Sequence, residues 1–188
     1  MRCLNCAKFS FRFICKSCTS HLQRGSFLKR QIDDLVIYSA FYYSEVKPLL
    51  YSKHHIYGAF VYKSLGKIAK SKINLDLLEG KFNLIPIDDH VENGYSHTAI
   101  IAKELSSSKL KPLYNSLKAT NKVHYSGKPL SFRKANKRGF KVLKRANFPI
   151  ILVDDIVTTG ETLLQAKKAL QKEGLEVICA IVLADAGT

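Results

Sequence analysis

The stretch that decides the fold runs from Ile150 to Leu163 and reads IILVDDIVTTGETL. A continuous apolar run ends in two carboxylates, a Thr-Thr-Gly turn follows, and a helical pattern begins at once. A strand without polar alternation is typical of a sheet that is covered on both faces. Ligands of such open sheets bind beyond the carboxyl ends of the strands. The stretch therefore predicts a buried strand, ending at the two acids, that leads into a ligand site.

The turn after this strand has the composition of a phosphate site. Gly160 lets a ligand approach the backbone closely, and the free N–H groups of residues 158–162 would form an anion cradle on the helix dipole. The hydroxyls of the threonines at 158, 159 and 162 would add donors. Asp154 and Asp155 would repel a phosphate and suit ribose hydroxyls or a magnesium ion instead. The pattern predicts a sugar-phosphate site, and the plain alternative is that Thr158 or Thr159 only caps the helix.

Strand and helix patterns alternate on both sides of this stretch. They predict an α/β fold with a parallel sheet, flanked by helices and joined by right-handed crossovers. The expected strands cover residues 35–38, 41–43, 82–87, 148–153 and 175–184, and the expected helices cover 56–72, 96–106 and 160–173.

Four of the five cysteines lie within the first 18 residues, in two Cys-x-x-Cys pairs. Two such pairs supply the tetrahedral thiolate shell that structural zinc prefers. Alternating phenylalanines at 9, 11 and 13 predict a small hairpin between the pairs. Two disulfides or one redox pair are the alternatives, although disulfides fit poorly with a cytosolic chain. The predicted zinc ligands are Cys3, Cys6, Cys15 and Cys18, and Cys179 is predicted to be a buried strand residue.

The positive charge is concentrated in two places. The 188 residues carry 30 Lys and Arg against 15 Asp and Glu, and the excess comes from two acid-free blocks, residues 1–32 and 105–153. Such blocks attract phosphates, and the aromatic rings among them can stack on bases of single-stranded nucleic acid. The alternative is that the rings pack inward and the lysines are only solvated. The candidate nucleic-acid contacts are Lys122, Lys128, Arg133, Lys134, Lys137 and Arg138.

Composition narrows the class of protein further. An apolar content of 46% excludes a disordered or low-complexity chain. No run of 18 apolar residues is present, which argues against a membrane-spanning helix, and the first residues lack the apolar core of a signal peptide. We therefore expect a folded protein that is located in the cytoplasm and does not insert into a membrane.

The segment Val153–Thr162 resembles the phosphoribosyl pyrophosphate (PRPP) loop of type I phosphoribosyltransferases. Joined to the four-cysteine module, it resembles ComF-type competence proteins in particular. Ile85-Pro86-Ile87 is similar to the family's strand before the pyrophosphate loop, and Asn93-Gly94-Tyr95-Ser96-His97 occupies the place of that loop. Arg133-x-x-Asn136, followed by Gly139-Phe140, resembles the flexible loop, and Lys53 falls where the family usually has a lysine.

This resemblance implies a phosphoribosyltransferase-like domain at 81–188, preceded by a zinc ribbon at 1–25 and a hood or helical segment at 26–80. It implies uptake of transforming DNA into the cytosol, with single-stranded DNA and competence proteins such as a DNA helicase as partners. It also implies PRPP with Mg²⁺, with Asp154 and Asp155 as catalytic residues and with Val157, Thr158, Thr159, Gly160, Glu161 and Thr162 as PRPP contacts.

Enzymatic turnover stays open at this point. Asn93 replaces the arginine that the family has before the glycine, and arginine is the natural clamp for pyrophosphate. Three functions are compatible with the residues. They are a PRPP-binding zinc protein of DNA uptake, a catalytically active phosphoribosyltransferase of nucleobase or nucleotide metabolism, and a non-enzymatic DNA-binding adaptor.

Overall fold

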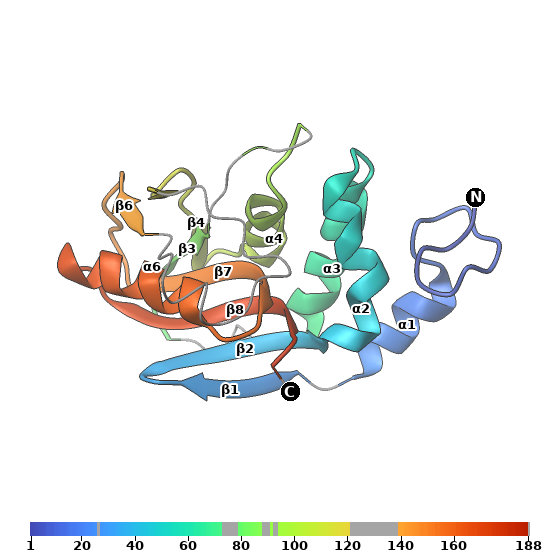
Figure 1. Ribbon diagram of the computed structural model, residues 1–188, viewed down its shortest axis with the longest axis horizontal. Helices are drawn as coiled ribbons and strands as arrows, with labels where there is room; N and C mark the ends of the chain where they lie inside the picture. The colour runs from blue at the N-terminus through green and yellow to red at the C-terminus, as the bar shows by residue number, and fades with distance from the viewer. Residues whose placement is uncertain (26, 73–78, 88–90, 92–93, 121–138, 188) are drawn as a thin grey trace.

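A computed structural model of the chain describes all residues except 26, 73–78, 88–90, 92–93, 121–138 and 188. Its centre is a six-stranded sheet in the order β1-β2-β8-β7-β3-β4 (Figure 1). The strands are β1 (Leu28–Ile32), β2 (Leu35–Tyr42), β3 (Phe82–Pro86), β4 (Leu110–Pro112), β7 (Ile150–Val157) and β8 (Val177–Asp185). A separate two-stranded sheet pairs β5 (Leu117–Ala119) with β6 (Phe140–Val142).

The main sheet is parallel from β2 to β4, and only the edge strand β1 runs antiparallel, to β2. The parallel core of the predicted sheet is thus confirmed, with one antiparallel strand added. The helices are α1 (Lys16–Arg24), α2 (Tyr43–Leu50), the 3₁₀ turn η1 (Tyr51–His54), α3 (Gly58–Lys72), α4 (His97–Leu105) and α6 (Glu161–Lys172).

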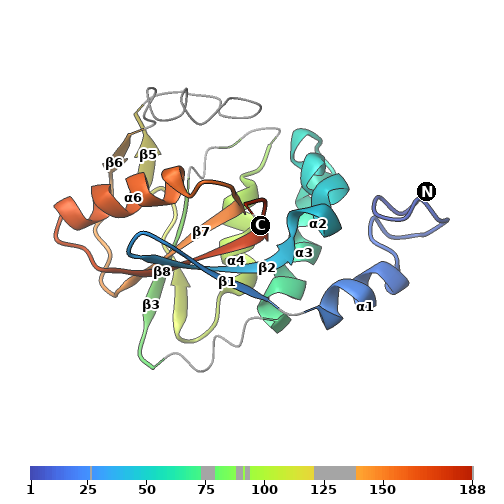
Figure 2. The same cartoon turned by 60° about the horizontal axis from the view of Figure 1, so that its bottom comes forward.

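Two hydrophobic cores cover the two faces of the sheet. Helices α2, α3 and α4 pack on one face, and α6 with the β5–β6 pair packs on the other (Figures 1 and 2). Successive residues of β7 point to opposite faces, so Ile151 and Val153 enter the first core while Ile150 and Leu152 enter the second. This double covering explains the continuous apolar run in the sequence.

Most of the expected elements are present, with differences in their bounds. The helices at α3, α4 and α6 and the strands at β3, β7 and β8 are confirmed. Strand β7 continues through both acids to Val157, so the expected end at residue 153 is wrong. The two short strands expected at 35–38 and 41–43 are one strand, β2, followed directly by α2.

The hairpin expected between the cysteine pairs is wrong. One isolated bridge joins Arg2 to Phe9, and residues 11–14 form bends rather than a strand. The alternating phenylalanines do not reflect a buried strand face, because Phe9 and Phe11 are exposed by 72% and 85%.

The segment 26–80 has two roles in the architecture. Its first part supplies β1 and β2 to the same sheet as residues 81–188, and its second part supplies α2, η1 and α3 to one face of that sheet. No helix among the described residues is long and apolar enough to cross a membrane.

Candidate functional site

The carboxyl end of β7 carries the two acids to different environments. Asp155 is buried, with 6% of its surface exposed, on the side of the sheet that α3 and α4 cover. Asp154 is half-buried, and its Oδ1 accepts the backbone N–H of Asp155 at 2.8 Å. The strand therefore presents one carboxylate to the interior and leaves the other half-buried on the opposite face.

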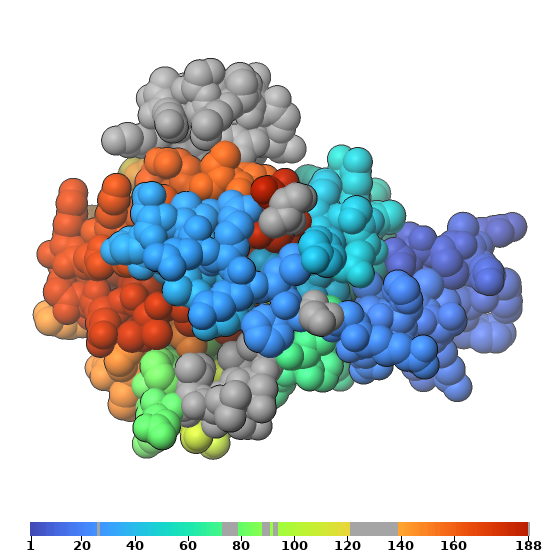
Figure 3. Space-filling view, turned by 90° about the horizontal axis from the view of Figure 1, so that it is seen from below, coloured from blue at the N-terminus to red at the C-terminus, as the bar shows by residue number. Residues whose placement is uncertain are grey.

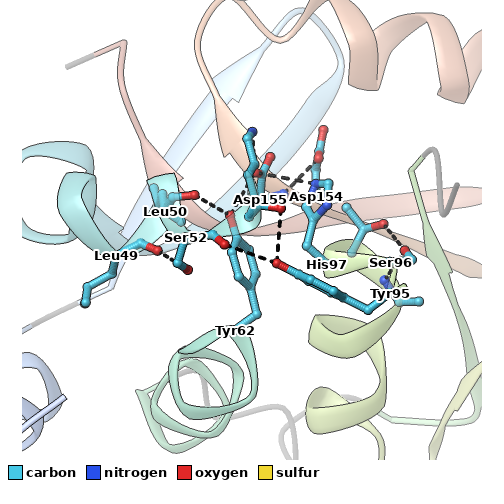
Figure 4. A network of polar contacts seen from close by, with 12 residues as sticks. Leu49, Leu50, Ser52, Tyr62, Tyr95, Ser96, His97, Asp154 and Asp155 are labelled. Atoms are coloured by element: carbon cyan, nitrogen blue, oxygen red, sulfur yellow. Dashed lines mark hydrogen bonds and ion pairs between the residues drawn. The ribbon is translucent and has the colours of Figure 1, made fainter. Parts of the chain in front are cut away.

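Three elements converge on the buried carboxylate of Asp155 (Figure 4). Lys53 from η1 donates to Oδ2 at 3.0 Å, and the hydroxyl of Tyr62 from α3 lies 3.2 Å from the same oxygen. The Nε2 atom of His97, the first residue of α4, lies 3.6 Å away. Asp155 is thus the common partner of the three elements that overlie this end of the sheet.

The contacts among Asp155, Lys53 and Tyr62 determine the protonation state of each of these side chains. Burial alone would raise the pKa of Asp155, but His97 and Lys53 and the hydrogen bonds from Lys53 and Tyr62 outweigh it and lower the pKa to about 2. Burial would lower the pKa of Lys53, and the charge of Asp155 raises it instead. At neutral pH the site therefore holds an ion pair between the buried Asp155 and the half-buried Lys53. Tyr62 is a protonated donor, because burial and Asp155 raise its pKa well above the ordinary value.

The turn that carries Lys53 is held in place by Tyr95. Its hydroxyl oxygen lies 3.2 to 3.3 Å from the backbone carbonyl oxygens of Ser52, Lys53 and His55. Gly58 makes this approach possible, because a Cβ there would lie 2.1 Å from both the Ser52 oxygen and the Tyr95 hydroxyl. The position of the ammonium group that faces Asp155 is therefore fixed by packing behind it.

The turn from β7 into α6 leaves the start of the helix without a side-chain cap. Gly160 occupies the N-cap position with φ +75° and ψ 0°, a left-handed conformation, and has no side chain to bond the first turn. A Cβ at Gly160 would lie 2.6 Å from Cδ1 of Ile32 on β1. Since the first amides of a helix have no acceptor within the helix, this end is suited to an anion.

Arg30 on β1 braces the other side of the same turn. Its guanidinium donates to the carbonyl oxygen of Thr158 and to Oδ1 of Asp185, the latter at 2.7 Å. The N–H of Gly187 donates to the same Asp185 oxygen at 2.8 Å. The carbonyl of Thr158 is thereby directed to Arg30 and away from the start of α6.

Glu161 faces along its own helix. Its Oε1 accepts from Nε2 of Gln165 at 2.8 Å, and Oε1 of Gln165 accepts the N–H of Gly139 at 3.1 Å. This chain of bonds joins the first turns of α6 to the residue before β6. The carboxylate of Glu161, beside this turn, therefore accepts a hydrogen bond from the neutral side chain of Gln165.

The four N-terminal cysteines form one cluster. Their sulfur atoms all lie within 4.8 Å of one another, with 3.9 Å between those of Cys3 and Cys18 and 3.8 Å between those of Cys6 and Cys15. Four sulfurs about 2.3 Å from a tetrahedral zinc lie about 3.8 Å apart, so the donor set fits this metal. Backbone amides of Cys15 and Cys18 donate to sulfurs of the cluster at 3.3 and 3.4 Å, which favours thiolates.

The pKa values of Cys3 and Cys18 are shifted in opposite directions. Burial raises the pKa of Cys3, but amide donors from Cys15, Cys6 and Asn5 outweigh it and lower the pKa to about 6. The pKa of Cys18 rises to about 12 because of burial and its bonds to Cys15 and Cys6. Charge on one sulfur therefore opposes charge on the next, and a divalent metal would remove that conflict. The cluster is compatible with a metal such as zinc.

Sequence reasoning located part of this arrangement. The acids, the Thr-Thr-Gly turn and the cysteines lie at two separate places, the first at the end of β7 and the second at the N-terminus. Tyr62 and Arg30 were missed, because a tyrosine on an apolar helix face and an arginine in a basic block carry no signal of their own. The six candidate nucleic-acid contacts between Lys122 and Arg138 lie outside the described residues.

Comparison with known families agrees with this geometry. Residues 93–188, which hold α4, the acids, the turn and β8, match the phosphoribosyl transferase domain model. The chain belongs to this family. The match begins after the cysteine cluster and after Lys53, so the phosphoribosyltransferase model does not account for the first half of the chain.

Individual phosphoribosyltransferases are similar over shorter stretches. An orotate phosphoribosyltransferase of Sulfurisphaera tokodaii is 36% identical over 64 residues, 31% of this chain and 33% of that protein. Two crystal forms of a Staphylococcus aureus hypoxanthine phosphoribosyltransferase align with TM-scores of 0.40 and 0.38 at 14% identity, over 66% and 68% of this chain and 62% and 64% of theirs. The chain thus spans about a third of its curated relative and less than two thirds of these solved structures.

The cysteine cluster predicts a specific metal dependence. Replacing Cys15 by Ser removes one thiolate of the shell, and we expect the metal content to fall from about one zinc per chain to nearly none. Metal analysis of the purified protein measures this. The control is Cys179→Ala, which changes a buried strand cysteine and should leave the metal in place. Full metal content in Cys15→Ser would show that the cluster does not hold the metal.

The lowered pKa of Asp155 predicts a pH-dependent contribution to stability. Because the folded-state pKa lies below the unfolded value near 3.9, the carboxylate stabilises the fold above pH 4, and this contribution is lost as the pH falls through about 2. Asp155→Asn should therefore cost about 2 kcal/mol of unfolding free energy at pH 7 and progressively less below pH 4.

Urea unfolding of both proteins across this pH range measures the difference. The matched control is Asp33→Asn, which neutralises an exposed carboxylate in the turn between β1 and β2 and should change stability little. Equal stability of Asp155→Asn and the unmodified protein at pH 7 would contradict the assigned ion pair.

Proposed function

We propose that this protein binds PRPP with Mg²⁺ at the β7–α6 turn and handles single-stranded DNA taken up into the cytoplasm, as a ComF-type protein of natural competence. The observation that carries the sugar-phosphate half is the turn itself. Its carbonyl at Thr158 is engaged by Arg30, its N-cap is a glycine, and it lies in a phosphoribosyltransferase domain. The observation behind the DNA half is the concentration of positive charge in acid-free blocks.

The residues of the site would divide the ligand among them. The amides of the turn, with the hydroxyls of its threonines, would hold the 5-phosphate at the positive end of α6. Asp154, which is half-buried at the strand end, would face the ribose hydroxyls or the magnesium ion. Asp155 would act through its ion pair with Lys53, which sets the position of η1 beside the strand end. The four cysteines would hold zinc as a structural ion.

A catalytically active transferase is the second candidate, and the 64-residue likeness to an orotate phosphoribosyltransferase favours it. In that reaction a base nitrogen displaces pyrophosphate from the anomeric carbon of PRPP, and catalysis is mostly positioning and charge stabilisation. Pyrophosphate release measured with a panel of nucleobases tests this candidate. Release with any of them supports it, and silence across the panel favours a binding role.

Calorimetry with PRPP and Mg²⁺ tests the sugar-phosphate site. Gly160→Ala should weaken binding at least tenfold, because a Cβ there strains the left-handed backbone and displaces Ile32, which moves the turn. Unmodified protein should bind with measurable heat and should be stabilised against thermal unfolding.

The matched control is Gly174→Ala, at the far end of α6. Gly174 has φ +72°, close to that of Gly160, and an added Cβ there meets nothing within 4 Å. Both variants therefore carry the backbone penalty of about 1–2 kcal/mol, and only Gly160→Ala should lose ligand affinity. If the unmodified protein gives no heat and no stabilisation, the sugar-phosphate half of the proposal is wrong.

A further inference from the structure

A groove of about 500 Å³ lies between the cysteine module and helix α3, away from the end of β7. The module forms one end of the molecule, beside the helical layer (Figure 3). One wall comes from the loop at Phe11–Ile14 and from α1, and the other comes from α3. The volume lies in the range of sites that hold small ligands or parts of larger ones.

The charge of this groove has one sign. Its charged lining residues are Arg12, Lys63 and Lys67, and each of the three is exposed. Among the residues that the structure describes, none of the three has an ion-pair partner. Both walls come from acid-free sequence, residues 1–32 and 46–75. The fold therefore brings together two basic segments that are separate in the chain.

Aromatic rings lie among these cations. Phe60 on α3 is 64% exposed and Phe11 is 85% exposed, although both line the groove. Phe13 stacks on Tyr57 with ring centroids 5.3 Å apart and lies 6.1 Å from the ring of Phe60. Exposed apolar residues that gather in one patch rimmed by polar groups mark interaction surfaces.

One face of α3 repeats the pattern along the groove. Phe60, Lys63 and Lys67 are spaced by three and four residues, so the ring and the two ammonium groups lie in a row on the helix surface. Ser64 adds a hydroxyl to the same row. Alternating flat rings and cations are what a flexible polyanion of bases and phosphates requires.

We propose that the groove between the cysteine module and α3 binds single-stranded nucleic acid, with bases stacked on Phe60 and Phe11 and with phosphates on Arg12, Lys63 and Lys67. This inference rests on the nucleic-acid half of the proposed function and gives it a location in the described part of the chain. The concave shape fits unstacked bases, whereas duplex bases are stacked on each other and are not available to the rings. A planar bilayer would meet protruding rings, but it would not enter a groove.

The test is fluorescence anisotropy with a labelled oligothymidylate, using the full zinc-loaded chain. Phe60→Ala should weaken binding about fivefold or more, since each stacked base contributes substantially to affinity. Alanine keeps the helix intact, and the side chain is already exposed, so folding is preserved. Lys63→Gln with Lys67→Gln should reduce the slope of log affinity against log salt by about 1.4, because each phosphate that a lysine neutralises adds about 0.7 to that slope.

Two matched variants serve as controls. Lys168→Gln with Lys172→Gln removes an exposed lysine pair of the same spacing from α6. Tyr42→Ala removes a ring that is 48% exposed at the end of β2, outside both acid-free blocks. Both should bind the oligonucleotide as the unmodified protein does.

The outcomes distinguish the location of binding in the groove from the binding of single-stranded nucleic acid by the protein. If the unmodified protein binds the oligonucleotide and the groove variants bind equally well, the groove assignment is overturned while the proposed function stands. If the unmodified protein does not bind even at low salt, both fail. Cosedimentation with anionic phosphatidylglycerol vesicles completes the test. Groove variants that lose vesicle binding but keep the oligonucleotide would assign the surface to a membrane instead.

Discussion

A single buried carboxylate holds the helical layer in register with the end of the sheet. Lys53, Tyr62 and His97 come from three different elements, and each approaches the same oxygen of Asp155. A buried charge without partners is very costly, so this contact opposes movement of the three elements away from β7. The placement of η1, α3 and α4 over the end of β7 depends on this contact.

The antiparallel pair of β1 and β2 supports the turn between β7 and α6. Arg30 and Ile32 lie two residues apart on β1, so their side chains emerge on the same side of the strand. One takes the carbonyl of Thr158, and the other packs against Gly160. A turn that offers its amides to an anion must satisfy its carbonyls elsewhere, and β1 provides part of that support.

The sequence predicted those elements whose pattern lies within a short stretch of the chain. Buried apolar runs and helical periodicity located β7, β8 and α3, and the cysteine spacing located the cluster. Helix α2 was not predicted, because Pro48 lies inside it and its first residue reads as the continuation of a strand. The pairing of β1 was hidden by its polar composition. The network at Asp155 could not be predicted, since its partners lie 102 and 93 residues away along the chain.

Helix α3 contributes both to the groove beside the cysteine module and to the network at Asp155. Its outer face forms one wall of the groove beside the cysteine module, and its inner face carries Tyr62 to the buried acid. Any ligand that displaces α3 at one of these two places would therefore change the free energy of binding at the other. Thermodynamic linkage makes this effect equal in both directions. The cysteine module and the end of β7 therefore share one helix, and a displacement of α3 at either place would change the packing at the other.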